Sequence, residues 1–119
     1  MKYWFNIMKL DSAVFYTNNL EKVISFYRDI VGLDIEYIQE GKFVSFQFEN
    51  GRLGIKQAKE EREIPGHQTV FIETEDIEKK YNEFKKKGMI FLKELTKENW
   101  ATNFSFLDPD GNKVQFIKR

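Results

Sequence analysis

The sequence predicts an α+β fold in which two β-α-β-β-β units follow one another and form a curved mixed sheet around a central cleft. The first observation is the segment 106–116, FLDPDGNKVQF, which has a tight turn between two apolar runs. Pro109 fixes φ, Asp110 is the expected capping side chain and Gly111 accepts a positive φ, so a hairpin is expected. The second is a weaker copy at 46–55, FQFENGRLGI, with an Asn-Gly turn. Two similar hairpins indicate an internal repeat.

Composition limits the classes of function. The 119 residues have the length of one domain, so we treat 1–119 as a single domain. The 19 basic and 19 acidic residues give a net charge of zero, which argues against binding nucleic acid or an anionic membrane. Without cysteine there is no disulfide, thiol nucleophile or thiolate metal site. No stretch resembles a signal peptide or a membrane span, which predicts a cytoplasmic protein.

The first unit is expected to span residues 10–57, after a short strand or leader arm at 1–9. A strand at 10–17 leads to a helix at 20–31, which Asn19 can cap and Gly32 can end. A strand at 33–39 and a hairpin of 43–48 with 52–57 complete it. The helix has apolar residues at a 3.6-residue period, which predicts one buried face formed by Leu20, Val23, Ile24, Tyr27, Ile30 and Val31.

The second unit, residues 67–118, repeats this order after a polar linker at 58–66 that ends in Pro-Gly. We expect a strand at 68–74, a helix from a cap at Asp76 through Lys87, a strand at 89–95, and a hairpin of 102–107 with 113–118. Gly88 ends the second helix as Gly32 ends the first. The inner face of that helix should carry Ile77, Tyr81 and Phe84.

Strand alternation assigns the two faces of each sheet. If Val70 and Ile72 pack under the helix, then Thr69, Phe71 and Glu73 face the cleft, and the other strands follow the same rule. Trp100 is expected either to stack on a planar ligand or to seal the cleft. The predicted cleft is uncharged apart from Glu73 and has aromatic walls. The ligand-binding residues predicted in this way are Ser12, Tyr16, Gln47, Thr69, Glu73, Trp100, Asn103 and Gln115.

The chain resembles the glyoxalase, bleomycin-resistance protein and dioxygenase family, also called the vicinal-oxygen-chelate superfamily. Residues 19–33, NLEKVISFYRDIVGL, are similar to that family's first helix, DLEKSxxFYRDxLGL. Trp100 followed by FLDPDGN at 106–112 resembles its W-G…F-x-DPDGN ending, with Ala101 in place of the usual glycine. The resemblance covers nearly all of residues 10–118. It implies tandem units around a cleft, and its relatives are usually dimers, so a homodimer is expected.

Metal-dependent members of that family hold a divalent ion with His, Gln or Glu from four cleft strands. At the matching places this sequence has Ser12, Thr69 and Gln115, and either Gly54 or Ile55 according to the hairpin register. Only Gln115 could bind an ion, and neutral amides and hydroxyls are poor ligands for such metals. We therefore predict neither a metal site nor a cofactor.

Two ionisable residues are the weak candidates for catalysis. Glu73 could act as a general base if an aromatic cleft raised its pKa, although a half-exposed or lysine-paired carboxylate fits equally well. His67 is the single histidine, and it could replace the missing ligand if the strand began early. A surface residue after the Pro65-Gly66 turn is the simpler interpretation of His67.

Three functions remain open. The first is a metal-free protein that binds a small, mostly neutral, partly aromatic molecule and acts by sequestration, as the bleomycin-resistance branch does. The neutral charge makes a cationic drug such as bleomycin a poor candidate ligand. The second is a glyoxalase-type lyase or isomerase, dependent on a divalent metal at a non-standard site that uses His67 and Glu73. The third is a non-catalytic interaction module whose cleft is filled by its own aromatic side chains. The sequence also leaves open whether the two units pair within one chain or by exchange between chains.

Overall fold

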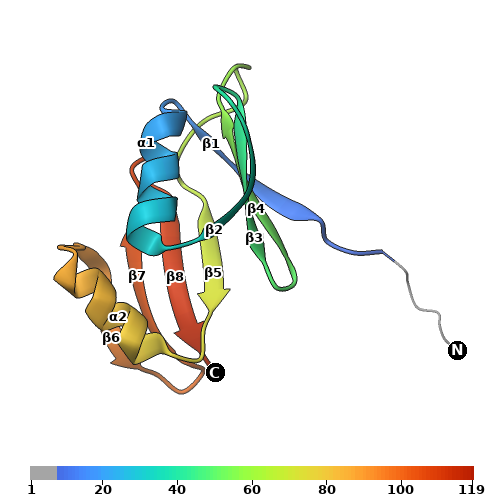
Figure 1. The fold of residues 1–119 in the computed structure, drawn as a ribbon. Coiled ribbons are helices and arrows are strands. Elements are labelled where there is room, and N and C mark those ends of the chain that lie inside the picture. The colour runs from blue at the N-terminus through green and yellow to red at the C-terminus, as the bar shows by residue number, and fades with distance from the viewer. Residues whose placement is uncertain (1–7) are drawn as a thin grey trace, which may run out of the picture.

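The computed structural model describes residues 8–119, and its element order repeats almost without change (Figure 1). The strand or leader arm predicted at 1–9 lies almost wholly outside the described residues, and Met8 and Lys9 are not in a strand. The first unit contains β1 Ser12–Thr17, α1 Leu20–Ser25, η1 Phe26–Val31, β2 Asp34–Gln39, β3 Phe43–Phe48 and β4 Gly51–Gln57. The second contains β5 Thr69–Glu73, α2 Ile77–Lys86, β6 Phe91–Lys97, β7 Thr102–Leu107 and β8 Lys113–Lys118.

Each unit forms its own four-stranded mixed sheet, in the orders β1-β4-β3-β2 and β5-β8-β7-β6. The first strand of each unit runs parallel to the last, and the other neighbours are antiparallel. The α+β fold of repeated units is therefore confirmed. The strands of the two units lie in separate sheets, and β1 and β5 are the edge strands of those sheets.

The first helix changes its winding half-way. Asn19 caps it as predicted, since its side chain accepts a hydrogen bond of 3.1 Å from the Lys22 amide. From Phe26 to Val31 the backbone is a π-helix, and Gly32 ends it with a φ of 84°. The boundaries of the predicted helix are confirmed, but its single 3.6-residue period is not. As one consequence Ile30, expected on the buried face, is only half-buried.

The second helix begins at the predicted residue, but the predicted capping hydrogen bond does not form. Asp76 occupies the N-cap position, but its side chain makes no capping hydrogen bond. Instead, Thr74 Oγ1 accepts a hydrogen bond of 3.4 Å from the Asp76 amide. Ile77 and Phe84 are buried as expected, while Tyr81 is half-buried and its hydroxyl donates to Glu94.

A single apolar core contains residues of both units. In the second unit it is rich in stacked phenylalanines, for example Phe104 and Phe116 with ring centroids 5.3 Å apart. The first helix contacts these phenylalanines of the second unit through Phe26, which packs edge-on against Phe106 at 5.9 Å. The core thus joins units that no β-ladder joins.

A polar contact at the final turn also joins the units. Tyr27 Oη donates a hydrogen bond of 2.6 Å to Asp108 Oδ2. Asp108 Oδ1 accepts from the amides of Asp110 and Asn112, both at 2.9 Å. The prediction that Asp110 caps this turn is therefore wrong, because Asp108 lies inside the turn and meets its amides. Burial, followed by the nearby Asp108 carboxylate, raises the pKa of the Tyr27 phenol far above its usual range.

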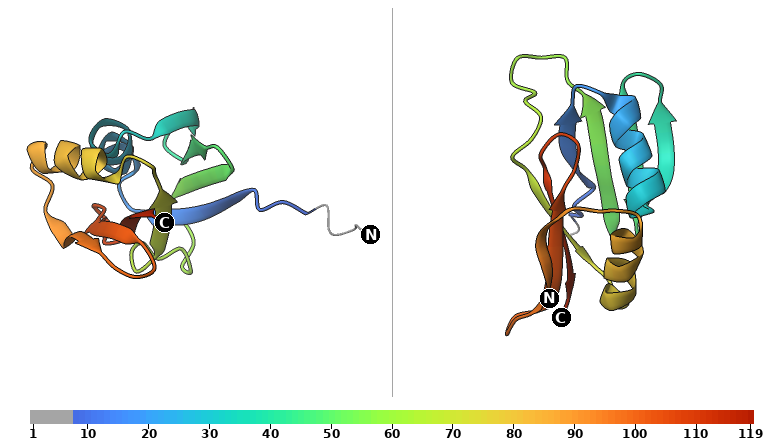
Figure 2. Two further views of the ribbon diagram at one scale, coloured as in Figure 1. Left: turned by 90° about the horizontal axis from the view of Figure 1, so that it is seen from below. Right: turned by 90° about the vertical axis from the view of Figure 1, so that its left-hand side faces the viewer.

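The two helices lie on one side of the molecule and follow one another end to end (Figure 2). Lys87 Nζ, just beyond the end of α2, donates to the carbonyl oxygens of Asp29 and Ile30 at 3.0 and 3.1 Å. These carbonyls belong to the last turn of η1, where a cation is favourable.

The segment between β4 and β5 is fixed by Glu63, which is buried. Its carboxylate accepts hydrogen bonds from Lys56 Nζ at 2.7 Å and from the amides of Lys59 and Glu60. The Lys56 contact, followed by the two amides, lowers the pKa of Glu63 from 4.5 to about 2.

Within the described part of the chain, no helix is long and apolar enough to cross a membrane.

Candidate functional site

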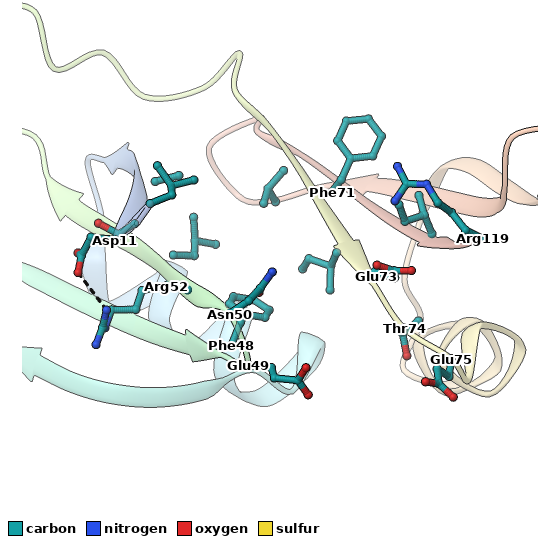
Figure 3. Close-up of a pocket in the computed structure, with 18 residues that line it drawn as sticks. Asp11, Phe48, Glu49, Asn50, Arg52, Phe71, Glu73, Thr74, Glu75 and Arg119 are labelled. Atoms are coloured by element: carbon teal, nitrogen blue, oxygen red, sulfur yellow. Dashed lines mark hydrogen bonds and ion pairs between the residues drawn. The ribbon is translucent and has the colours of Figure 1, made fainter. Parts of the chain in front are cut away.

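A groove of about 750 Å³ lies at the junction of the two units (Figure 3). One wall is the start of β1 with the β3–β4 turn, and the other is the end of β5. The first wall includes Glu49 from the turn and Arg52 from β4, and the second includes Phe71 and Glu73 from β5 and Glu75 just beyond it. In volume the groove is similar to known small-molecule sites.

An ion-pair network determines the charge of the first wall. Arg52 contacts Asp11 at 3.0 Å and Glu36 at 2.9 Å, and the Ser45 hydroxyl donates to Glu36 at 2.8 Å. The Arg52 hydrogen bond, followed by that from Ser45, lowers the pKa of Glu36. Strand alternation does not predict this network, because Glu36 is the extra residue of a β-bulge between Ile35 and Tyr37. Simple alternation along β2 cannot locate such a residue.

Seven of the eight predicted ligand-binding residues lie on the two outer sheet faces, which we define as the faces turned away from the helices, and Trp100 lies in the loop between β6 and β7. Only Ser12 and Glu73 also line the groove, one on each wall. Tyr16 is half-buried near the end of β1, and Gln47 lies beside a separate hollow near Gly32. Thr69 is exposed at the start of β5. The single chain therefore does not bring the whole predicted set into one cavity.

The weak catalytic candidates are separated in the same way. Glu73 is exposed in the groove. His67 precedes β5, has a φ of 65° and is exposed, but it does not line the groove. Because Gly66 before it passes close to the Asp110 carbonyl oxygen, the backbone here follows the final turn rather than the groove.

On the outer face of the second sheet, polar side chains bind one another. Gln115 Nε2 donates to Asn103 Oδ1 at 3.0 Å, and Asn103 Nδ2 donates to Glu98 Oε2 at 2.7 Å. Glu98 also pairs with Lys93, and this contact, followed by that with Asn103, lowers the pKa of Glu98. Gln115 and Asn103 are buried, so their amide groups are held in fixed orientations.

Beside this network lie two exposed aromatic side chains. Phe71 is 55% exposed, Trp100 is 47% exposed, and their rings meet edge-on with centroids 6.3 Å apart. Large aromatic surfaces exposed side by side are typical of contact sites for planar ligands or partners. Trp100 also borders a second hollow, of about 650 Å³, near the start of α2.

The strand registers decide which β4 residue corresponds to Gln115. Gln115 pairs with Phe71 on β5, and Gly54 pairs with Val14 on β1 in the same way. Ile55, the other residue considered, is buried in the core. A Cβ atom on Gly54 would lie 2.4 Å from Phe43 Cζ, so the Phe43 ring covers this position.

The resulting set of side chains does not fit a divalent ion. The four places hold Ser12, Gly54, Thr69 and Gln115, none of which is a carboxylate or an imidazole. Among residues 8–119, no three His, Asp or Glu side chains are grouped closely enough to hold an ion. We therefore assign no chemical step to a metal at these positions.

The repeated units, the paired registers and the final turn are features that the chain shares with a known family. The family model described as the Glyoxalase/Bleomycin resistance protein/Dioxygenase superfamily matches residues 9–116. The chain belongs to this superfamily. The resemblance noted from the motifs at 19–33 and 106–112 is thereby confirmed.

Solved structures that are similar to this chain come from proteins with different roles. TnmS3, an antibiotic binding protein from Streptomyces sp. CB03234, has a TM-score of 0.85 at 19% identity, covering 97% of this chain and 98% of its own. Lactoylglutathione lyase from Agrobacterium tumefaciens has a TM-score of 0.76 at 18% identity, covering 92% of both chains. A sequence relative, the uncharacterized protein YraH of Bacillus subtilis (strain 168), is 28% identical over 93% of this chain and 98% of its own.

Proposed function

We propose that this chain binds a small, partly aromatic molecule without a metal ion and acts by sequestration in the cytoplasm. The observation that carries the proposal is the Phe43 ring over Gly54. An aromatic ring occupies the position from which a metal ligand would extend in metal-dependent relatives. At the equivalent place in the second unit, the Gln115 amide is already hydrogen-bonded to Asn103. The surroundings of Gly54 and Gln115 therefore favour a ligand site formed by aromatic rings and side-chain amides rather than a metal site.

In this proposal the ligand contacts the outer faces of both sheets, and a second copy of the chain completes the site. Support comes from apolar side chains that these faces leave uncovered, among them Val14, Tyr37 and Phe71, which are 39%, 51% and 55% exposed. A homodimer would cover them and bring the two sets of predicted residues together. Size-exclusion chromatography with light scattering measures this mass directly.

The similarity to TnmS3 agrees with a binding role, and the similarity to lactoylglutathione lyase agrees equally well with an enzyme. Because both identities are below 20%, they support the fold and not a choice between the two. The rival function, a metal-dependent lyase or isomerase with a non-standard site, rests on the exposed carboxylate of Glu73 in the groove.

The experiment uses Trp100 as the reporter. A Trp4→Phe variant leaves Trp100 as the sole tryptophan, and EDTA removes metal ions. We titrate this variant with three probes of one size: 1-naphthalenemethanol, 1-naphthoate and 1-naphthylmethylamine. We expect saturable quenching of Trp100 by at least one probe, weakened by Phe71→Ala, and recovery of that probe unchanged after denaturing the protein.

Two outcomes would contradict the proposal. One is a chemically altered probe, which would indicate catalysis. The other is quenching that appears only after a divalent ion is restored, which would indicate a metal-dependent site. Circular dichroism on Phe71→Ala verifies that lost quenching reflects a lost contact, since Phe71 is exposed and its replacement should leave the fold intact.

A further inference from the structure

The outer face of the first sheet carries a stacked aromatic pair, which we call the Tyr37–Phe43 platform. The two ring centroids are 6.0 Å apart with an interplanar angle of 29°. Tyr37 is 51% exposed, and Phe43 is half-buried because its ring lies over Gly54. The Phe43 ring thus packs directly on the backbone of Gly54.

The platform borders a hollow of about 540 Å³ whose charged lining residues all have one sign. They are Lys42, Lys56 and Lys59, and no carboxylate lines the hollow. The remaining lining residues are Tyr37, Gln39, Gly41, Phe43 and Gln57. This differs from the groove at the unit junction, which is lined by Asp11, Glu49, Glu73 and Glu75 as well as two arginines.

Two nearby acids, Glu63 and Glu36, are already paired with cations. Glu63 accepts hydrogen bonds from Lys56 Nζ at 2.7 and 2.8 Å. Glu36, next to Tyr37 in β2, pairs with Arg52 at 2.9 Å. Of the ion pairs within residues 8–119, none includes Lys42 or Lys59. The hollow therefore has two exposed ammonium groups whose charge is not offset by its own walls.

We infer that this hollow binds a planar aromatic anion. The ring of the ligand stacks on the Tyr37–Phe43 platform, and its carboxylate or sulfonate group accepts hydrogen bonds from Lys42 and Lys59. An aromatic cation is excluded by like charge, and a neutral ring gains only the stacking contact. The inference rests on the proposed binding function, and it adds the class of ligand.

The test measures the affinities of the same three naphthalene probes by isothermal titration calorimetry at low salt, using the intact protein. The test variant is Lys42→Gln with Lys59→Gln. The matched control is Lys22→Gln with Lys86→Gln, which removes two exposed lysines from the helices on the opposite side of the sheets. A third variant, Tyr37→Leu, removes half of the platform.

We expect 1-naphthoate to bind about tenfold more tightly than 1-naphthalenemethanol, and the amine to bind most weakly. The Lys42/Lys59 variant should lose about this tenfold preference, while the Lys22/Lys86 control keeps it. Tyr37→Leu should weaken naphthoate and the alcohol together, since both use the ring contact. Added salt should weaken naphthoate alone.

The inference is overturned if naphthoate binds no better than the alcohol, or if the Lys42/Lys59 variant keeps the preference while circular dichroism shows it folded. In either case saturable quenching of Trp100 by any probe would leave the proposed binding function standing. If none of the probes binds at all, both proposals fail.

Discussion

The hydroxyl of Tyr27 lies 2.6 Å from Asp108 Oδ2, so the first helix is hydrogen-bonded to the last turn of the chain. Both side chains are buried, with exposed fractions of 0% for Tyr27 and 5% for Asp108. Asp108 also accepts hydrogen bonds from Asn112 Nδ2 at 3.0 Å and from two turn amides. The same carboxylate therefore shapes the final turn and fixes the first unit against the second.

Removing this hydroxyl should destabilise the whole protein. Tyr27→Phe leaves a buried carboxylate with one donor fewer, so we expect the free energy of unfolding to fall by about 1–3 kcal/mol. Urea unfolding measures the change. Tyr81→Phe is the matched control, because it also removes a phenolic hydrogen bond, but one made to the exposed Glu94. Equal losses in the two variants would show that burial of the Tyr27–Asp108 pair is unimportant.

Stability should depend on pH through Glu63. Its pKa is lowered from 4.5 to about 2 in the folded protein, so the folded state favours the ionised form. The contribution of this carboxylate is present above about pH 4.5 and is lost as the pH falls toward 2. The melting temperature of the wild-type protein should fall through this interval, and the fall should be smaller in Glu63→Gln.

The control for that measurement is Glu61→Gln, which removes the same charge from an exposed neighbour two residues away. It should reproduce the wild-type pH profile. If Glu63→Gln has the wild-type slope between pH 4.5 and 2, the contacts of Glu63 with Lys56 and the amides do not contribute to acid stability.

Gly54 and Phe43 should be energetically coupled. Since a Cβ on Gly54 would lie 2.4 Å from Phe43 Cζ, Gly54→Ala must displace the ring. We expect a loss of about 1 kcal/mol of unfolding free energy, at the low end for overpacking, because Phe43 is half-buried and can move. In a Phe43→Leu background, the same substitution should cost less. A double-mutant cycle in urea measures the coupling, and purely additive losses would contradict the contact.

Divalent ions should not stabilise the wild-type protein. An ion bound at 100 times its dissociation constant would add about 2.7 kcal/mol and raise the melting temperature measurably. We therefore expect no shift when Ni²⁺, Zn²⁺, Mn²⁺ or Fe²⁺ is added singly to EDTA-stripped protein. A shift that disappears in His67→Ala would instead establish a metal site.

A variant that restores the missing ligands gives this panel a positive control. Combining Ser12→His, Thr69→His and Gln115→Glu supplies the imidazole and carboxylate groups that such ions prefer. A response in this variant alone would show that the side chains, rather than the fold, prevent metal binding in the wild-type protein.

Much of the fold follows from local signals in the sequence. The hairpin of 102–107 with 113–118 has the predicted boundaries, because its turn and alternation agree. Alternation also places β5 correctly, with Ile72 buried and Thr69, Phe71 and Glu73 exposed. Gly32 ends the first helix as predicted, with its positive φ. These features depend only on neighbouring residues.

The features that the sequence does not reveal depend on contacts between distant residues. Glu36 reaches the outer face through a bulge set by the pairing of β2 with β3. Tyr27 fits an apolar helix position, and nothing local indicates that its hydroxyl bonds to Asp108. Phe43 was assignable to the outer face by alternation, but its position over Gly54 requires the register of β3 with β4.

The separation of 81 positions in the sequence between Tyr27 and Asp108 also affects how the protein is made. A nascent chain contains the complete first unit long before the ribosome adds the turn that Tyr27 contacts. Until then, the side of the first helix that packs on Phe106 has no partner, and its apolar surface is available to chaperones or to other nascent chains. Premature termination before residue 108 would leave that surface uncovered permanently, so truncated products are expected to be removed by proteases rather than to accumulate as folded halves.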